Sequence, residues 1–307
     1  MTQALEPTRL VISRFLDSIS DSGYTPSTSR FYLNHINYAL KIMQEIRPGI
    51  HPTTVEKADV LRFIEVMRER DYAVSTQKLY ICALRRICAF SGNYVLDRSN
   101  MVIRWPSDTR PHVDWLTIEQ SRTLLYTPMT PTQELIVHCE LCLGMRRCEI
   151  QRLKLRDISD GRITVTGKGP VGGKLRMLPF HPRTAAVLER YMRHRDNVIA
   201  EAIVRNRDSV EVPDSLLIYR HGTHLHAYSS VRYTGIDKHI RQLCESVGFE
   251  FSNHTLRRTF GRTMYRSGVP LATIAKMLGH ESTEVTLRYI GVDLDDMASA
   301  MQMYQLR

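Results

Sequence analysis

The sequence predicts a mainly α-helical protein with one small antiparallel β-sheet. Apolar residues recur at helical spacing along most of the chain, whereas the stretch 162–179 alternates apolar and polar residues around glycines, as a β-hairpin does. A proline-containing segment without periodicity, 106–111, divides the chain. We therefore expect a helical domain at 1–105, a linker at 106–111 and an α+β domain at 112–307.

Composition narrows the class of protein. Of the 307 residues, 43% are hydrophobic and 24% are charged, as in a globular protein with a buried core. Because no apolar run could cross a bilayer and the first residues do not resemble a signal peptide, we expect a cytoplasmic protein without membrane contact. The formal net charge of +10 makes a polyanion the first partner to suspect. A basic ribosomal or membrane-surface protein would carry the same charge.

The first 105 residues contain four stretches of helical periodicity separated by short turns. The predicted helices run from Thr8 to Asp21, from Pro26 to Pro48, from Lys57 to Arg70 and from Ser75 to Gly92. Basic residues on the second and fourth of these helices are candidates for contacts with DNA phosphates, or else belong to an ordinary solvated face. They are Arg30, Lys78, Arg85 and Arg86.

Residues 112–307 combine helices with the predicted hairpin. Thr117 and Gln120 have capping-box spacing, which restarts helical structure. In the hairpin, Leu175 and Met177 belong to the apolar set that alternates with polar residues, and the glycine-rich tip carries lysines. Further helices are predicted from Pro131 to Gly144, at 184–204, 231–247, 254–266 and 271–278, after the cap Ser282, and in an amphipathic tail at 293–306.

Metal-type residues occur without a zinc pattern. His221, His224 and His226 have spacings that fit no zinc motif and lack a nearby cysteine or carboxylate, which favours an exposed loop over a metal site. The six cysteines lie mostly in apolar helical patterns, so we expect reduced core thiols. We expect neither a metal nor a cofactor.

The stretch 253–289 concentrates residue types that suit chemistry better than core packing, namely two histidines, an arginine and a tyrosine. Cutting a phosphodiester without a metal requires a nucleophile, cations for the phosphate oxygens and a proton for the leaving 5′ oxygen. Arginine suits the phosphate, and histidine and lysine suit proton transfer. A tyrosine nucleophile keeps the bond energy in a phosphotyrosine, so rejoining needs no ATP. The chain offers these types in the order Arg146, Lys168, His254, Arg257, His280 and Tyr289.

Four motifs carry a family resemblance. They are Leu143-Gly144-Met145-Arg146-x-x-Glu149; Gly167-Lys168-Gly169 with Lys174-x-Arg176-x-x-Pro179; His254-x-Leu256-Arg257; and Leu278-Gly279-His280 with Tyr289 nine residues later. In this order and at these spacings, residues 112–307 resemble the catalytic domain of the tyrosine recombinases of the phage integrase family. Residues 1–105 resemble, more loosely, that family's helical core-binding domain.

The resemblance implies a role for each motif residue. Tyr289 would attack the phosphorus, form a 3′-phosphotyrosyl link and free a 5′ hydroxyl, while Arg146 and Arg257 clamp the non-bridging oxygens. Lys168 would be the general acid for the leaving 5′ oxygen, and His254 the general base. His280 would form a hydrogen bond to the phosphate, and Glu149 would support the neighbouring side chains.

The chain departs from the family pattern at three places. The lysine loop is longer than the common form, so Lys174 is a minor rival to Lys168 as the acid and a candidate for a DNA contact. Arg258 stands where many members have a second histidine, a change that we do not expect to alter the chemistry. Tyr265 and Tyr304 are alternative nucleophiles on paper only, one in a packed helix and one in the tail.

The resemblance also implies partners and a biological role. The two domains would clamp duplex DNA, and a homotetramer would pair two sites, exchange strands through a Holliday junction and pass each C-terminal helix to a neighbour. The expected function is site-specific recombination for integration, excision or resolution, as in mobile elements, with the need for accessory DNA-bending proteins left open. The alternatives are a type IB topoisomerase-like or junction-resolving enzyme and a catalytically idle DNA-binding regulator.

Overall fold

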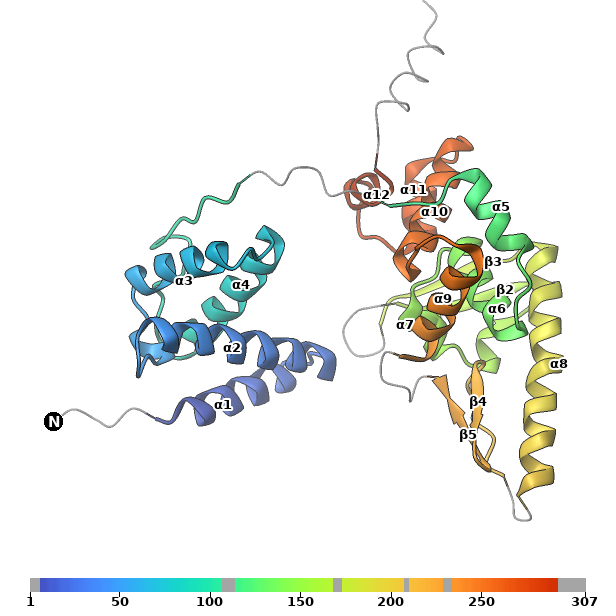
Figure 1. Cartoon of the computed structure of the whole chain (residues 1–307), viewed down its shortest axis with the longest axis horizontal. Helices are drawn as coiled ribbons and strands as arrows, with labels where there is room; N and C mark the ends of the chain where they lie inside the picture. The colour runs from blue at the N-terminus through green and yellow to red at the C-terminus, as the bar shows by residue number, and fades with distance from the viewer. Residues whose placement is uncertain (1–5, 107–113, 168–172, 207–209, 229–233, 292–307) are drawn as a thin grey trace, which may run out of the picture. The chain divides into compact units, whose positions relative to one another are not determined.

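The computed structural model describes residues 6–106, 114–167, 173–206, 210–228 and 234–291, and the chain divides into two compact units, Met1–Pro111 and His112–Arg307 (Figure 1). Nearly all of the expected linker at 106–111 and the whole tail expected at 293–306 lie outside the described residues. Within the described ranges, no helix is both long and apolar enough to cross a membrane.

The described part of the first unit consists of helices. They are α1 (Thr8–Asp21), α2 (Pro26–Ile46), the short 3-10 helix η1 (Pro52–Thr54), α3 (Lys57–Glu69) and α4 (Val74–Phe90). Helix α2 contacts α1, α3 and α4. Ile36, Met43, Phe63 and Leu84 are fully excluded from water in the core between these helices, and burial of such side chains contributes about 1.5–3 kcal/mol each. The four helices predicted from the apolar periodicity are therefore confirmed.

The second unit is organised around α6 (Pro131–Leu141), which contacts α7 (Arg147–Arg152), α8 (Pro182–Arg205), α9 (Thr234–Val247) and α10 (Asn253–Arg266). Helix α6 is buried nearly all round, as a central helix must be. The preceding helix, α5 (Ile118–Tyr126), begins at the predicted capping box. There the Thr117 hydroxyl accepts from the Gln120 backbone amide, and the Gln120 side chain accepts from the Thr117 amide.

Two small antiparallel sheets accompany these helices, where the sequence predicted one. In the first sheet, β1 (Ile158–Ser159), β2 (Arg162–Thr166) and β3 (Leu175–Pro179) lie in that order, with β2 paired to β3 from Arg162–Pro179 to Thr166–Leu175. This pairing confirms the hairpin predicted at 162–179. The second sheet is a hairpin of β4 (Ile218–His221) and β5 (His224–Ala227).

The second hairpin corrects the expectation of an exposed loop around His221, His224 and His226. A tight turn joins the strands, and Ile218 and Leu225 are buried on their inner face. Here apolar and polar residues alternate along β5 after a two-residue turn that contains a glycine, which is the pattern of a β-hairpin. The sequence prediction missed it because it considered the three histidines only as possible metal ligands or as an exposed loop.

The outer strand of the first sheet also differs from its prediction. Leu175 and Met177, the apolar members of the predicted alternation, are 69% and 64% exposed. Because Val165 pairs with Arg176 and Ile163 with Leu178, the inward-facing partners of the buried β2 residues are Arg176 and Leu178. An arginine thus occupies a position that apolar patterning alone would give to a leucine.

The turn after α6 carries the motif that runs from Leu143 to Glu149 and brings it next to the last helices. Gly144 lies in this turn with φ +61°, and a Cβ there would come within 2.4 Å of the Phe260 ring on α10. Only glycine fits such a close approach in this backbone conformation. The chain then continues through Arg146 into α7. The Arg146 side chain donates to the carbonyl of Gly279, which lies between α11 (Leu271–Leu278) and α12 (Thr283–Ile290), and the Gly144 carbonyl accepts from Arg257 on α10.

Candidate active site

The site is centred on the buried carboxylate of Glu149, which has no exposed side-chain surface. Arg146 is the N-cap of α7, and Glu149 is the third residue of that helix. The Glu149 carboxylate accepts from the Arg146 backbone amide at 2.7 Å and from its guanidinium at 2.9 Å. Arg146 and Glu149 therefore form a capping box whose carboxylate is buried.

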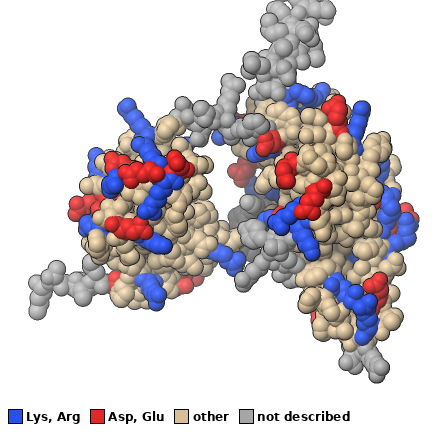
Figure 2. All heavy atoms as spheres, viewed as in Figure 1, with Lys and Arg blue, Asp and Glu red and all other residues tan. Residues whose placement is uncertain are grey.

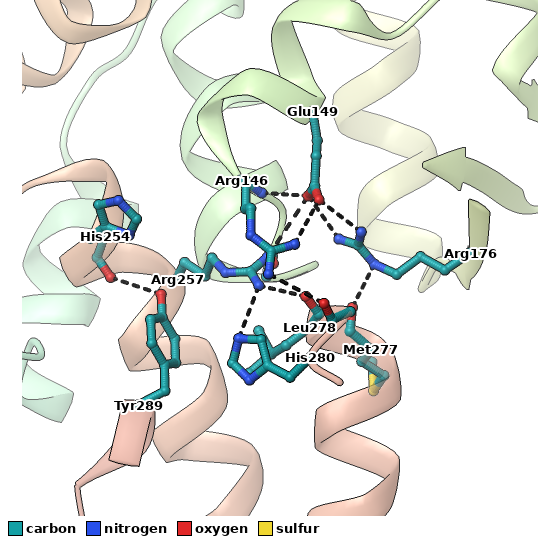
Figure 3. Close-up of polar contacts among 11 residues, drawn as sticks. Arg146, Glu149, Arg176, His254, Arg257, Met277, Leu278, His280 and Tyr289 are labelled. Carbon is teal, nitrogen blue, oxygen red and sulfur yellow. Dashed lines mark hydrogen bonds and ion pairs between the residues drawn. The ribbon is translucent and has the colours of Figure 1, made fainter. Parts of the chain in front are cut away.

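Arg176 reaches the same carboxylate from β3 (Figure 3). Its Nη1 donates to Glu149 Oε1 at 2.9 Å and its Nη2 to Oε2 at 2.8 Å, while its Nε donates to the Met277 carbonyl at 2.8 Å. The guanidinium of Arg257 lies 3.8 Å from Glu149 Oε2. Burial alone would raise the pKa of the Glu149 carboxyl, but the hydrogen bonds and charge of Arg176, helped by Arg146 and Arg257, hold it below its ordinary value.

Arg257 comes from α10 and is 2% exposed. Its guanidinium donates to the backbone carbonyls of Gly144 and Leu278, and one nitrogen lies 3.4 Å from His280 Nε2. Burial, followed by the charge of Arg146, lowers the pKa of Arg257 to about 10. The side chain therefore keeps its positive charge at neutral pH, and two backbone carbonyls fix its direction.

His280 follows Gly279 at the end of α11 and faces the two arginines. Its Nδ1 lies 3.0 Å from the hydroxyl of Thr286, a fully buried residue of α12. Burial and the nearby positive charges of Arg257 and Arg146 lower the pKa of His280 to about 4. The imidazole is thus neutral at physiological pH and can form a hydrogen bond without adding charge.

Tyr289 on α12 lies beside His280, with ring centroids 5.0 Å apart in an edge-on arrangement. The guanidinium carbons of Arg257 and Arg258 lie 5.8 and 5.5 Å from the centre of the Tyr289 ring. The Tyr289 hydroxyl donates a long hydrogen bond, 3.5 Å, to the backbone carbonyl of His254, as Figure 3 shows. Burial raises the pKa of Tyr289, and the two arginines oppose that rise.

The structure therefore brings together Arg146, Glu149, Arg257, His280 and Tyr289, with the first turn of α10 at their side. The His254 side chain is exposed on that turn, and its backbone carbonyl is the atom that meets Tyr289. Lys168 lies outside the described residues. The residue before it, Gly167, is buried close to Glu149, so β2 leads the chain to this site.

The rival residues differ from the proposed acid and nucleophile in their surroundings. Lys174 is exposed and its ammonium is 2.7 Å from the Glu281 carboxylate. Tyr265 is half-buried and packs in the cluster of Phe260, Ile274 and Leu278. Tyr304 lies outside the described residues. In the described ranges, no three histidine, cysteine or acidic side chains are placed to hold a metal ion.

The candidate DNA contacts of the first unit differ in their surroundings. Arg30 and Arg86 are exposed, and Arg86 lies 3.4 Å from the Tyr24 hydroxyl. Arg85 donates to the Leu96 carbonyl at 2.7 Å and so has a structural contact, whereas Lys78 is half-buried. Figure 2 shows acidic and basic side chains interleaved on one face of this unit.

Two residues around the site had no role predicted from the sequence, namely Arg176 and Thr286. Arg176 belongs to a quoted motif, but its place on an apparently apolar hairpin gave no sign that it would be buried. Thr286 precedes Tyr289 by three residues and therefore shares its helix face, which is a usable signal. The Gly144 and Leu278 carbonyls, which accept from Arg257, are backbone atoms, so the pattern of side chains in the sequence could not predict their role.

Comparison with known proteins agrees with this geometry. Residues 114–295 match the phage integrase family, and residues 11–88 match the phage integrase N-terminal SAM-like domain. A helical first unit, an α+β second unit and a tyrosine among paired arginines are the features of a DNA strand-breaking and rejoining fold. The chain belongs to the phage integrase family, that is, to the tyrosine recombinases.

Individual relatives cover most of both chains. The tyrosine recombinase XerA of Pyrococcus horikoshii is 23% identical, over 96% of this chain and 94% of that protein. The tyrosine recombinase XerC of Roseiflexus sp. is 30% identical, over 78% of this chain and 75% of that protein. The structure also resembles that of the XerH site-specific recombinase bound to difH in a pre-cleavage complex, with a TM-score of 0.64, 17% identity and 99% of each chain covered. It likewise resembles the structure of a lambda integrase dimer bound to a COC′ core site. The TM-score is 0.64 and the identity 15%, over 92% of this chain and 95% of that chain.

Proposed function

We propose that this chain is a site-specific DNA recombinase that cuts and rejoins duplex DNA through a covalent link to Tyr289. The observation that carries the proposal is the convergence of Arg146, Arg257 and His280 beside the Tyr289 ring. Tyrosine recombinase relatives that align with both units support it.

In the proposed cleavage step, the Tyr289 oxygen attacks the phosphorus while the bond from phosphorus to the 5′ oxygen breaks. The phenol proton leaves toward His254 as general base, and the 5′ oxygen takes a proton from Lys168 as general acid. The product is a 3′-phosphotyrosyl link and a free 5′ hydroxyl. Rejoining is the reverse attack by a 5′ hydroxyl, which needs no metal, ATP or cofactor because the phosphotyrosine keeps the bond energy.

The electrostatics of the site suit this step. Arg146, Arg176 and Arg257 surround one carboxylate, so the cluster has an excess of two positive charges. We propose that Arg146 and Arg257 direct their remaining N–H groups to the non-bridging phosphate oxygens, with His280 as a neutral hydrogen-bond partner and Glu149 orienting its neighbours. Fixed charges of this kind stabilise the transition state most strongly in a site of low polarity.

The state of the nucleophile makes a base necessary. Because burial raises the pKa of Tyr289, the phenol keeps its proton at neutral pH. Arg257 and Arg258 counteract the rise, and once a phenolate develops their charges stabilise it. A nearby acceptor such as His254 then completes the deprotonation.

We propose duplex DNA as the partner, in keeping with the solved XerH and lambda integrase complexes. The further parts of this proposal follow the family pattern. The protein would form a homotetramer that exchanges C-terminal helices, with DNA-bending accessory proteins where a site requires them. It would act on a mobile element in the cytoplasm. The residues proposed to contact DNA are Arg30, Lys78, Arg85, Arg86 and Lys174. Recombinase relatives favour this function over a topoisomerase-like enzyme, and the assembled site favours it over an idle regulator.

Covalent trapping tests the proposal. The protein is incubated with labelled, nicked duplexes tiled from the DNA that flanks its gene, and wild type is compared with Tyr289→Phe. Tyr265→Phe is the matched control, because this second tyrosine belongs to the same packed cluster. We expect a denaturant-resistant adduct in wild type and Tyr265→Phe and none in Tyr289→Phe.

Two results would contradict the proposal. An adduct that persists in Tyr289→Phe would assign the nucleophile to another residue. A wild-type protein that binds the duplexes without forming any adduct would support the idle regulator. Relaxation of a plasmid that lacks the recombination site, without strand exchange, would instead support the topoisomerase-like enzyme.

A further inference from the structure

Arg176 occupies an unusual position for a charged residue. It lies on β3, which is the last strand in the order β1-β2-β3, and its side chain is only 9% exposed. Its neighbours Leu175 and Met177 face outward and stay largely exposed. Turning this strand over would bury two large apolar side chains, so the observed orientation requires a strong specific interaction for Arg176.

That interaction involves all three nitrogens of the Arg176 guanidinium. Two nitrogens donate to the two Glu149 oxygens, and Nε donates to the Met277 carbonyl. A planar guanidinium can meet two carboxylate oxygens and a third acceptor at once, which an ammonium cannot. Three of its five N–H groups are engaged in this way, and because the side chain is also almost wholly buried, Arg176 is poorly placed to bind a DNA phosphate itself.

The Arg176 side chain also contacts the backbone on both sides of the site. At Gly279, directly before His280, a Cβ would lie 3.2 Å from an Arg176 nitrogen, and Gly279 has φ +63°. At Gly167, directly before Lys168, a Cβ would lie 3.8 Å from the same nitrogen and 3.6 Å from Glu149. One side chain therefore lies between the α7 cap, the end of β2 and the turn that carries His280.

The Glu149 oxygens show what Arg176 does for the other arginines. Each oxygen accepts one hydrogen bond from Arg176 and one from Arg146, and Arg257 is 3.8 Å away. Without Arg176, the buried carboxylate would lack half of these donors, and Arg257 is the nearest cation that could turn to replace them. A turned Arg257 would point away from a bound phosphate.

We propose that Arg176 is a positioning residue for DNA cleavage, which satisfies Glu149 and fixes the Gly279–His280 turn so that Arg146, Arg257 and His280 meet the phosphate. The proposal rests on the cleavage function proposed above. Arg176 itself touches neither the DNA nor the nucleophile, and it acts through these neighbours.

The test separates the cleavage rate from DNA affinity. Single-turnover adduct formation on the nicked duplex and the equilibrium Kd for that duplex are measured for wild type, Arg176→Gln and Arg176→Lys. The matched control is Arg190→Gln, because Arg190 also grips a carboxylate with two nitrogens, that of Glu134, but joins α8 to α6 away from the site. Thermal melting of each variant reports whether it is folded.

We expect Arg176→Gln to form the adduct about 100-fold more slowly with a Kd within about threefold of wild type, and Arg190→Gln to behave as wild type. Arg176→Lys should recover only part of the rate, because its single ammonium cannot span the same three acceptors. An Arg176→Gln rate within about threefold of wild type would overturn the proposal. A loss of DNA affinity as large as the loss of rate would also overturn it, because Arg176 would then be a DNA contact.

A double variant tests whether Arg176 acts through Glu149. It also keeps the test valid if Arg176→Gln alone folds poorly. Replacing both partners removes the buried carboxylate that Arg176→Gln leaves with only half of its hydrogen bonds, so Glu149→Gln/Arg176→Gln should fold at least as well as the single variant. If Arg176 acts through Glu149, this variant cleaves no more slowly than Glu149→Gln. Independent, multiplying losses would contradict the proposal. An adduct missing even from wild type would instead contradict the cleavage function itself.

Discussion

Arg257 shows how a single charged residue is prepared for a ligand. It is almost wholly buried, and its pKa is lowered to about 10, yet it remains a cation at neutral pH. The carbonyls of Gly144 and Leu278 hold its guanidinium in place. A side chain fixed by the backbone loses little freedom when the phosphate arrives, which is the advantage of a preorganised site.

His280 gives a prediction about pH. Its pKa of about 4 lies below the ordinary value of 6.5, because the folded chain disfavours its charged form. The unfolded chain therefore takes up this proton first as the pH falls. The stability that the neutral imidazole contributes is complete above about pH 6.5 and decreases toward pH 4.

Proton NMR of the imidazole ring checks this expectation. The His280 signal, identified by its absence in His280→Gln, should stay almost unchanged from pH 8 to pH 5 in the folded protein. The same residue in urea should titrate near its ordinary value. A midpoint near 6.5 in the folded protein would contradict the buried, neutral imidazole.

At the scale of elements, local sequence signals predicted most of the fold. The helix at Leu271–Leu278 lies between Pro270 and Gly279, and α5 starts at its capping box, as predicted. The facing of β3 could not be predicted this way, because Arg176 turns inward for a carboxylate 27 residues earlier in the chain. Periodicity reports local preference, whereas this strand follows a distant charge.

The same distinction applies to the site. Arg146, Arg257, His280 and Tyr289 could be chosen from residue type together with the motifs of the family resemblance, and the structure brings them together. The partners that hold them, such as Arg176 and the Gly144 carbonyl, depend on how distant segments pack. Residue types indicate the chemistry, and tertiary contacts determine the geometry.

The turn between α6 and α7 gives a prediction at this scale. Gly144→Ala combines a strained backbone with a clash against Phe260, whereas Gly161→Ala has similar strain, φ +72°, and nothing within 4 Å. We expect Gly161→Ala to lower the free energy of unfolding by about 1–2 kcal/mol. Gly144→Ala should cost about 1–3 kcal/mol more, the usual range for overpacking.

Urea denaturation of the two variants measures this difference. Gly144→Ala should also slow adduct formation, because the clash moves the turn that leads to Arg146. Equal losses of stability in the two variants would mean that the turn can shift away from Phe260 without cost.

At the scale of the whole molecule, each unit has its own core. Phe63 is fully buried in the first unit and Leu216 in the second. Replacing either with alanine should lower the stability of its own unit by about 2–5 kcal/mol. We propose that the units unfold separately, in keeping with a linker at 106–111 between domains at 1–105 and 112–307.

Calorimetry distinguishes separate from joint unfolding. Phe63→Ala should lower one melting transition and Leu216→Ala the other, each with little effect on its counterpart. If both variants move a single shared transition, the two units unfold together and the proposed division is wrong.

The excess of two positive charges around Glu149 affects how the protein behaves in ordinary buffers. We expect sulfate or inorganic phosphate to bind at the arginine-lined site of the folded chain and to find no such site in the unfolded one. At a hundred times its Kd, such an anion would raise the free energy of unfolding by about 2.7 kcal/mol. The same anion would occupy the place of the DNA phosphate, so the buffer that best preserves the protein in storage would also slow its reaction.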